Sequence, residues 1–180
     1  MLTELFKTEE RACILRYVMY RKSFCAVDVS RDTGVTKGLV SRYLHILVLH
    51  GFLQKNGRVY SPYDCARCRA LRLLLNLERI DLSALSLGSA SGIGLYGSWA
   101  MGTNDQKSDL DFWIKADSLP DQSILARLQR DLSVQTGSEV NLLMLTPEKL
   151  DRIRREDPPF YNSLFFNSVT LKGEPIEEYR

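Results

Sequence analysis

The sequence predicts a mixed α+β protein built from two parts. Residues 1–80 hold 14 Lys and Arg against 7 Asp and Glu, whereas residues 81–180 hold 10 against 15. Apolar residues recur at helical spacing through the first part, and strand-like runs alternate with helical segments in the second. A basic part beside an acidic part indicates a polyanionic partner for the first, although the overall charge is only +2.

Three helices are expected in the basic part. Thr8 can cap the first, which extends to about Arg21. A brief second helix covers about 26–33. A third begins after Thr36 and ends at Gly51, where a glycine just beyond a helix belongs.

Residues 52–61 predict a β-hairpin, because two short strands surround Asn56-Gly57. Three helices followed by this hairpin, with the turn 32–36 and the phrase 40–44, resemble a winged helix-turn-helix domain. The resemblance implies that the third helix enters the major groove of DNA and that the hairpin lies over an adjacent groove or backbone. Because a single winged helix rarely binds DNA tightly, we expect a homodimer on a two-fold site.

Several polar residues lie off the apolar stripe of the third helix or on the hairpin, and they are the candidates for DNA contact. Arg42 is suited to read a guanine edge, whereas lysines and Arg58 are suited to phosphates. Solvated charges and protein contacts remain the alternatives. The candidates are Thr36, Lys37, Ser41, Arg42, Lys55 and Arg58, with Gly38 and His45 on the same side of the helix.

Residues 65–80 predict an amphipathic helix with a basic face, which could complete the first domain, form a dimer or connect to the next domain. Cys65 and Cys68 have the spacing of metal ligands, but Cys13 and Cys25 are far apart and no histidine is near them. We therefore expect reduced cysteines in or near apolar cores.

Residues 81–92 are rich in Ser and Gly and predict a linker between a first domain, 1–80, and a second, 93–180. In the second, helices are expected at 121–134, after Thr146, and from Pro158 to Asn167. Further strands are expected at 139–145 and 169–173.

The stretch from Gly94 to Lys115 is the best candidate for chemistry. An apolar strand, 93–96, breaks at Gly97-Ser98, and a second strand carries Asp109 and Asp111 on one side. Hard ions such as Mg²⁺ prefer oxygen ligands and usually bind one or two carboxylates together with phosphates. A glycine turn lets the backbone approach an anion. The stretch therefore predicts a phosphate and metal site.

Leu95 to Ser98, Ala100, Gly102 and Ser108 to Asp111 resemble the signature of the polymerase-beta-like nucleotidyltransferases, above all their minimal members. The resemblance implies a mixed sheet flanked by helices, Mg²⁺ or Mn²⁺, and transfer of a nucleoside monophosphate from an NTP to an acceptor. It assigns nucleotide binding to Gly97, Ser98 and Ser108, and metal binding and catalysis to Asp109 and Asp111. It also implies a helical partner of the toxin–antitoxin kind.

Asn141 departs from this pattern, because active members carry a third carboxylate where it stands. An amide cannot act as a general base near neutral pH. Glu139 lies two residues earlier on the same strand face and could substitute, so it joins the catalytic candidates. The alternative is a DNA-binding regulator whose second domain binds nucleotide or metal without turnover; a purely structural domain is the third reading.

No apolar run reaches the roughly 18 residues that span a bilayer, and the N-terminus lacks the layout of a signal peptide. We therefore expect a cytoplasmic protein without a membrane partner.

Overall fold

The computed structural model describes residues 2–83, 90–118 and 121–177. The chain divides into two compact units, Met1–Leu75 and Asn76–Arg180. The division falls inside one helix, before the segment 81–92 that the sequence predicts as a linker, and residues 84–89 of that segment lie outside the described part.

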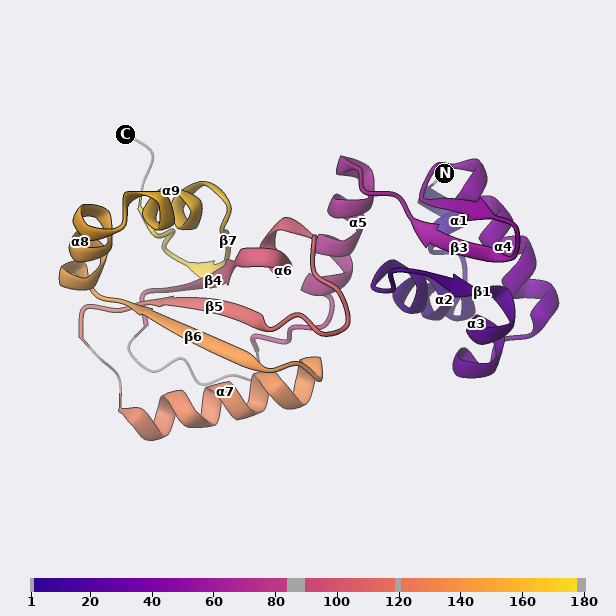
Figure 1. Ribbon diagram of the computed structural model, residues 1–180. Coiled ribbons are helices and arrows are strands. Elements are labelled where there is room, and N and C mark those ends of the chain that lie inside the picture. The colour runs from indigo at the N-terminus through magenta and orange to yellow at the C-terminus, as the bar shows by residue number, and fades with distance from the viewer. Residues whose placement is uncertain (1, 84–89, 119–120, 178–180) are drawn as a thin grey trace. The chain divides into compact units, whose positions relative to one another are not determined.

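The first unit combines helices with a small antiparallel sheet of strand order β1-β3-β2 (Figure 1). Its core gathers the apolar faces of the helices and the start of the hairpin. The elements are α1 (Leu2–Leu5), α2 (Glu9–Met19), β1 (Phe24–Cys25), α3 (Ala26–Thr33), α4 (Lys37–Leu49), β2 (Leu53–Asn56), β3 (Val59–Pro62) and α5 (Ala66–Leu77), whose last two residues belong to the second unit.

Local signals account for the ends of these elements. The Thr8 side chain accepts a hydrogen bond from the backbone N–H of Arg11, which caps α2. Gly34 ends α3 with φ of +72°, and Gly57 turns the hairpin with φ of +60°. The three helices and the hairpin expected from the sequence are confirmed, whereas α1 and β1 were not expected. β1 arises through tertiary pairing, because Phe24 pairs with Tyr60 of β3.

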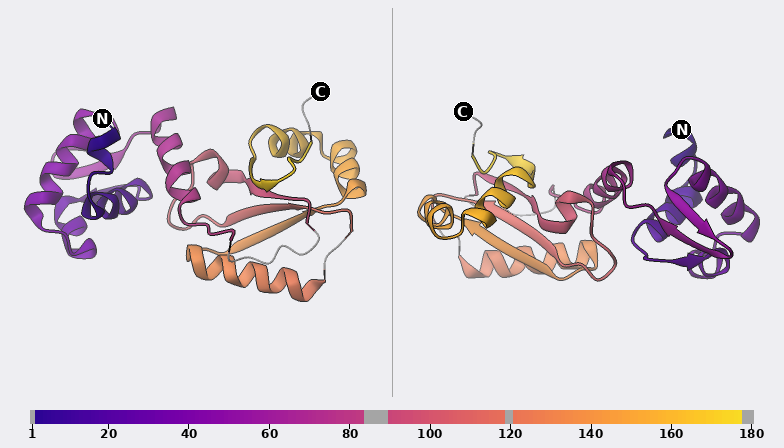
Figure 2. Two further views of the ribbon diagram at one scale, coloured as in Figure 1. Left: turned by 180° about the vertical axis from the view of Figure 1, so that it is seen from behind. Right: turned by 45° about the horizontal axis from the view of Figure 1, so that its top comes forward.

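The second unit is a four-stranded sheet of order β6-β5-β4-β7, with helices on both faces (Figures 1 and 2). β5 and β6 are parallel, and the other pairs are antiparallel. Its elements are β4 (Gly92–Tyr96), α6 (Gly97–Met101), β5 (Leu110–Lys115), α7 (Gln122–Thr136), β6 (Val140–Leu145), α8 (Pro147–Glu156), α9 (Pro158–Phe166) and β7 (Val169–Gly173).

Two apolar clusters cover the two faces of this sheet. On one face Leu110 and Phe112 of β5 pack with Leu128 and Leu132 of α7. On the other face Trp113 of β5 packs in a second cluster with residues of α8 and α9. The alternation along β5 therefore places Asp111 on the α8 and α9 face, and Asp109 directly precedes the strand.

Candidate functional site

The carboxylates of Asp109 and Asp111 flank a buried leucine at the start of β5. Leu110 is completely buried and pairs with Val140, so its side chain faces the α7 side. Asp109 is exposed, and Asp111 is half-buried. Because successive strand residues point to opposite faces, the Asp111 carboxylate points away from the α7 core. Asp109 precedes the strand, which begins at Leu110 and not, as the sequence predicts, before it.

The position of the Asp111 carboxylate leaves room only for glycine at residue 97. Tyr96, the last residue of β4, pairs with Asp111, so the turn that starts α6 lies against that carboxylate. Gly97 has φ of +68°, and a Cβ added to it would lie 2.6 Å from Oδ2 of Asp111. Any side chain at this position would therefore strain the backbone and displace the carboxylate.

Asn141 engages the same carboxylate from the neighbouring strand. It pairs with Asp111 across β5 and β6, and its Nδ2 donates a hydrogen bond of 3.1 Å to Oδ1 of Asp111. The Asn141 amide thus donates a hydrogen bond to the Asp111 carboxylate. A carboxylate at the same position would repel Asp111 unless a cation lay between the two groups. Glu139 lies just before β6 with an exposed side chain, and its carbonyl accepts the N–H of Leu110 at 2.8 Å.

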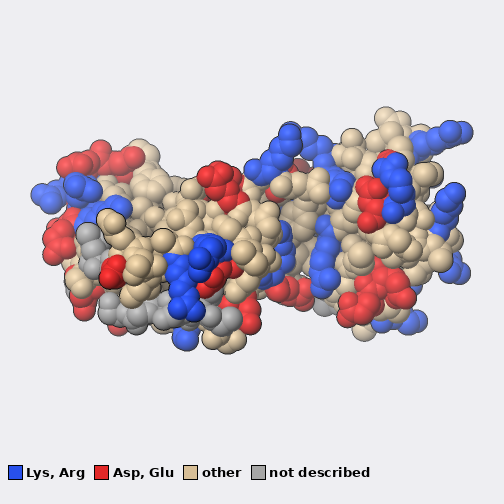
Figure 3. All heavy atoms as spheres, turned by 90° about the horizontal axis from the view of Figure 1, so that it is seen from below, with Lys and Arg blue, Asp and Glu red and all other residues tan. Residues whose placement is uncertain are grey.

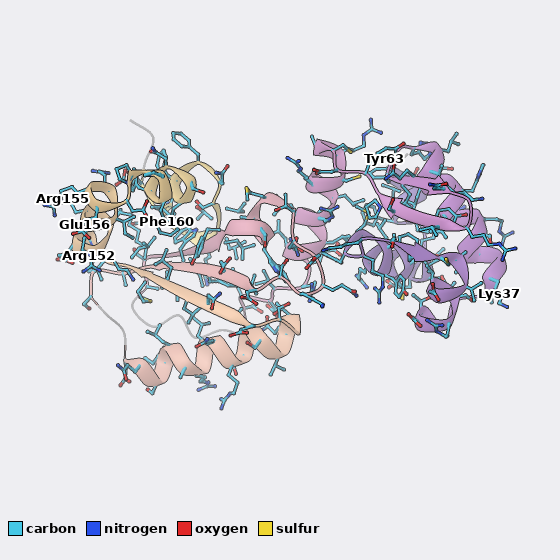
Figure 4. The ribbon with its side chains drawn as sticks, viewed as in Figure 1. Lys37, Tyr63, Arg152, Arg155, Glu156 and Phe160 are labelled. Atoms are coloured by element: carbon cyan, nitrogen blue, oxygen red, sulfur yellow. The ribbon has the colours of Figure 1, made fainter. Side chains whose placement is uncertain are left out.

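Aromatic side chains border the site on the α9 side. The rings of Tyr96 and Phe160 meet edge to face, with centroids 6.3 Å apart, and Phe160 lies on α9 in Figure 4. Burial raises the pKa of Tyr96 above its ordinary value, and the negative charge of Asp111 raises it further. Tyr96 therefore stays a neutral phenol beside the carboxylate near neutral pH.

A buried amide pair holds the loop that follows Gly97. Nδ2 of Asn76 donates to the carbonyl of Trp99 and to Oδ1 of Asn104, both at 2.9 Å. Asn104 donates back to Oδ1 of Asn76 at 3.2 Å. Both asparagines are almost fully buried, so the pair is satisfied internally. Asn76 did not enter the predicted site; its only signal was a polar residue within a leucine-rich helix.

The two serines of the motif have different surroundings. Ser98 is half-buried in α6, and its carbonyl accepts the N–H of Thr103 at 2.9 Å. The hydroxyl of Ser108 accepts the N–H of Asp105 at 2.9 Å and donates to the Asp105 carboxylate at 3.2 Å. In this structure Ser108 therefore orders the loop that leads to Asp109.

Trp99, Lys107 and Lys115 lie at different distances along the chain from the two aspartates. Trp99 is 1% exposed and belongs to the α7-side core, and its Nε1 donates to the Ser108 carbonyl at 3.4 Å. Lys115 sits at the far end of β5, where its Nζ donates to Glu174 at 3.0 Å. Lys107 is exposed in the loop before Asp109.

Two hollows lie away from the carboxylates. A cavity of about 710 Å³ at the C-terminal ends of β5 and β6 is lined by Lys115, Leu145, Arg154 and others. A shallower one runs along α8, past Arg152 and Arg155 (Figure 4). Neither contains a predicted catalytic residue, so the site rests on the geometry of Asp109 and Asp111.

The donor set fits one hard divalent cation. Asp109 and Asp111 offer carboxylate oxygens, which Mg²⁺ and Mn²⁺ prefer, and such ions commonly complete their shell with water and phosphate. Within residues 2–83, 90–118 and 121–177 no group of three His, Cys, Asp or Glu could hold a metal. The cysteines therefore form no such metal site in the described part.

The candidates for DNA contact are exposed residues of the first unit. Thr36 precedes α4, and Lys37, Ser41 and Arg42 lie exposed along it. Lys37 projects at the edge of the unit in Figure 4. Lys55 and Arg58 lie exposed on the hairpin, with the Lys55 ammonium 5.5 Å from the Tyr60 ring centroid. Figure 3 shows basic and acidic groups interspersed on the visible face of this unit, at the right.

Comparison with known proteins identifies the family of the second unit. A family model described as the nucleotidyltransferase domain matches residues 77–169, more than half of the chain. The chain belongs to the nucleotidyltransferase domain family. The match spans Gly97, Asp109, Asp111 and Asn141, so the candidate site lies within the matched segment. No curated protein matches the chain significantly.

Solved structures include similar chains from toxin–antitoxin complexes. One, a complex with AMP-PNP, is 21% identical, with a TM-score of 0.37, over 59% of this chain and 72% of that one. A mutant of MntA–HpeT is 20% identical, with a TM-score of 0.37, over 56% and 71%. A complex of a tri-AMPylated HEPN toxin from Shewanella oneidensis with its MNT antitoxin is 18% identical, with a TM-score of 0.33, over 59% and 73%.

No helix in the described part of the chain is long and apolar enough to cross a membrane.

Proposed function

We propose that the second unit transfers a nucleoside monophosphate from an NTP to an acceptor. The observation that carries this proposal is the contact of the Asp111 carboxylate with Gly97. It places a carboxylate beside a glycine turn whose backbone can approach a phosphate group. In the reaction the acceptor oxygen attacks the α-phosphate, the bond to the β-phosphate breaks, and pyrophosphate leaves. Positioning and charge neutralisation supply most of the acceleration in such transfers.

Each residue of the site has a role in this proposal. Backbone groups at Gly97 and Ser98 receive phosphate oxygens, and Asp109 and Asp111 hold Mg²⁺ or Mn²⁺. The bound ion would neutralise phosphate charge and polarise the reacting phosphoryl group. Asn141 holds the Asp111 carboxylate in orientation but takes no proton. The proton of the acceptor therefore passes to water or to the exposed carboxylate of Glu139.

One observation favours a second function, nucleotide or metal binding without turnover. The amide of Asn141 occupies the position of a third acid, and the described residues contain no carboxylate triad. Binding needs only the phosphate turn and one cation, whereas efficient transfer also benefits from a base for the attacking hydroxyl. The second unit would then serve as a nucleotide sensor.

Labelling with α-labelled NTPs separates the two functions. The chain is incubated with each NTP, Mg²⁺ or Mn²⁺, and cell extract as the acceptor source. An enzyme labels an acceptor, and the Asp109→Ala and Asp111→Ala variants do not. Asp117→Ala is the matched control, because it removes an exposed carboxylate beyond the other end of β5. A label that protease removes indicates a protein acceptor, such as the predicted helical partner.

Two further outcomes are decisive. Metal-dependent NTP binding without labelling by the wild-type chain would overturn the enzyme and support the sensor. If the Asn141→Asp variant labels an acceptor and the wild-type chain does not, the absence of transfer by the wild-type chain is due to the amide of Asn141.

For the first unit we propose a winged helix-turn-helix domain that binds DNA, as a homodimer on a two-fold site. Its support is the order of three helices and a hairpin, with exposed Lys37, Ser41 and Arg42 on α4. Selection from random duplexes should enrich a sequence. Arg42→Ala should weaken the preference for one base of the site by about 1–3 kcal/mol. Lys37→Ala should reduce the slope of log affinity against log salt concentration by about 1. Lys22→Ala, an exposed lysine outside α4, is the control.

Lack of enrichment, with an Arg42→Ala variant that binds like the wild type, would remove the DNA-binding proposal. Sedimentation with and without the selected duplex tests the dimer.

A further inference from the structure

Cys65 and Cys68 share the first turn of α5, directly after the hairpin. The carbonyl of Cys65 accepts the N–H of Arg69 at 3.0 Å, which is the first hydrogen bond of the helix. Cys65 therefore occupies the N-cap, and Cys68 stands three residues later, where an N-cap side chain makes contact. Residues three apart on a helix have Cα atoms about 5 Å apart, which lies within the range of roughly 4.4–6.8 Å found between the Cα atoms of disulfide-bonded cysteines.

The two thiols differ in environment. Cys65 is half-buried, whereas Cys68 is completely buried, with its Sγ donating to the Phe52 carbonyl at 3.5 Å. The backbone N–H of Cys68 donates to the Cys65 sulfur and lowers the pKa of that thiol, and Arg67 lowers it further. Burial raises the pKa of Cys68 to about 12. The half-buried Cys65 thiol therefore loses its proton more readily than the buried thiol of Cys68.

We propose that Cys65 and Cys68 form a reversible dithiol–disulfide couple, with small-molecule disulfides as the oxidant. The Cys65 thiolate attacks one sulfur of the oxidant, forms a mixed disulfide and releases one thiolate. Cys68 gives its proton to solvent and attacks the Cys65 sulfur, which closes the Cys65–Cys68 disulfide and releases a second thiolate. Two protein thiols are oxidised while one disulfide molecule is reduced to two thiols.

The fold accommodates this step. On oxidation the Cys68 sulfur turns from the Phe52 carbonyl towards Cys65. The Phe52 carbonyl still accepts the hydrogen bond from the backbone N–H of Tyr63, at 3.0 Å. Tyr63 is marked in Figure 4 in the segment between the hairpin and α5. The base of the hairpin therefore stays closed, and the oxidised chain should keep its secondary structure.

Cys25 provides a matched internal control. It is also a half-buried cysteine at a helix N-cap, that of α3, but Asp28 stands three residues later. Cys25 thus resembles Cys65 in its position at the start of a helix, but it has no second thiol three residues later.

The experiment equilibrates the full chain in buffers of varied ratio of reduced to oxidised glutathione, quenches with acid, and alkylates the remaining thiols. Peptide mass mapping should show a Cys65–Cys68 disulfide that forms in oxidising buffers and disappears in reducing ones. Cys13 and Cys25 should stay reduced at every glutathione ratio and therefore be alkylated. In Cys65→Ser, which keeps an N-cap oxygen, Cys68 should remain reduced. The alkylation rate of Cys65 should also titrate below the ordinary thiol value of roughly 8.5.

Circular dichroism of the variant and of the oxidised chain separates loss of the couple from unfolding. A mixed glutathione disulfide at Cys65 that never closes onto Cys68, in a folded chain, refutes the couple. Equal oxidation of Cys25 and Cys65 refutes it as well, because the effect would then belong to any N-cap cysteine.

Discussion

Replacing Gly97 with alanine perturbs the phosphate turn and the Asp111 carboxylate together. The φ of +68° costs an L-residue about 1–2 kcal/mol. The added Cβ would also lie 2.6 Å from Oδ2 of Asp111, which is inside van der Waals contact. Because that oxygen ends a side chain, we expect Asp111 to rotate rather than the backbone to move.

Gly137 is the matched control for the backbone term. It has φ of +65° at the end of α7, and a Cβ added there meets nothing within 4 Å. Both variants should lose about 1–2 kcal/mol of unfolding free energy. Rotation of Asp111 also breaks its hydrogen bond to Asn141, so Gly97→Ala should lose about a further 0.5–1.5 kcal/mol.

Urea unfolding followed by tryptophan fluorescence measures this loss in the second unit alone. The chain has two tryptophans, Trp99 and Trp113, and both are buried in that unit. Calorimetric titration with Mn²⁺ and each NTP then measures the site. We expect Gly97→Ala to bind about tenfold more weakly or worse, roughly 1.4 kcal/mol, and Gly137→Ala to bind like the wild type.

Equal affinities in the two variants would refute the reasoning, because the contact between Gly97 and Asp111 would then have no part in binding. A stability loss confined to Gly137→Ala would refute the assigned backbone strain.

Two further predictions concern the surroundings of the site. Asn76→Ala should cost about 2–4 kcal/mol in the same urea experiment, because it removes a hydrogen bond to the Trp99 carbonyl and both hydrogen bonds to the buried Asn104 amide. A loss under roughly 0.5 kcal/mol would contradict this. The raised pKa of Tyr96 means that the folded unit favours the neutral phenol, so its contribution to stability is complete below the ordinary value of about 10 and is lost as pH rises through the folded pKa. In an NMR titration, Asp111→Asn should lower the pKa of Tyr96 without restoring its ordinary value, since burial persists; an unchanged pKa would exclude the charge effect.

Local features could be predicted from the sequence because they follow from short-range geometry. Thr8 caps a helix and Asn56-Gly57 turns a hairpin through contacts within a few residues. The orientation of Asp111 away from the α7 core follows from the alternation of a strand, whatever the strand pairs with. The family signature around Gly97 is equally local, and the family match confirms a nucleotidyltransferase domain over residues 77–169.

Contacts between distant residues were decided only by the tertiary structure. Strand order and register bring Asn141 onto Asp111 and pair Lys115 with Glu174. Likewise, packing against the end of α5 gives Asn76 its partners in the loop after Gly97. The sequence by itself therefore determined two carboxylates and a glycine turn. Which group contacts the second carboxylate depended on pairing between strands 30 residues apart, which no periodicity encodes.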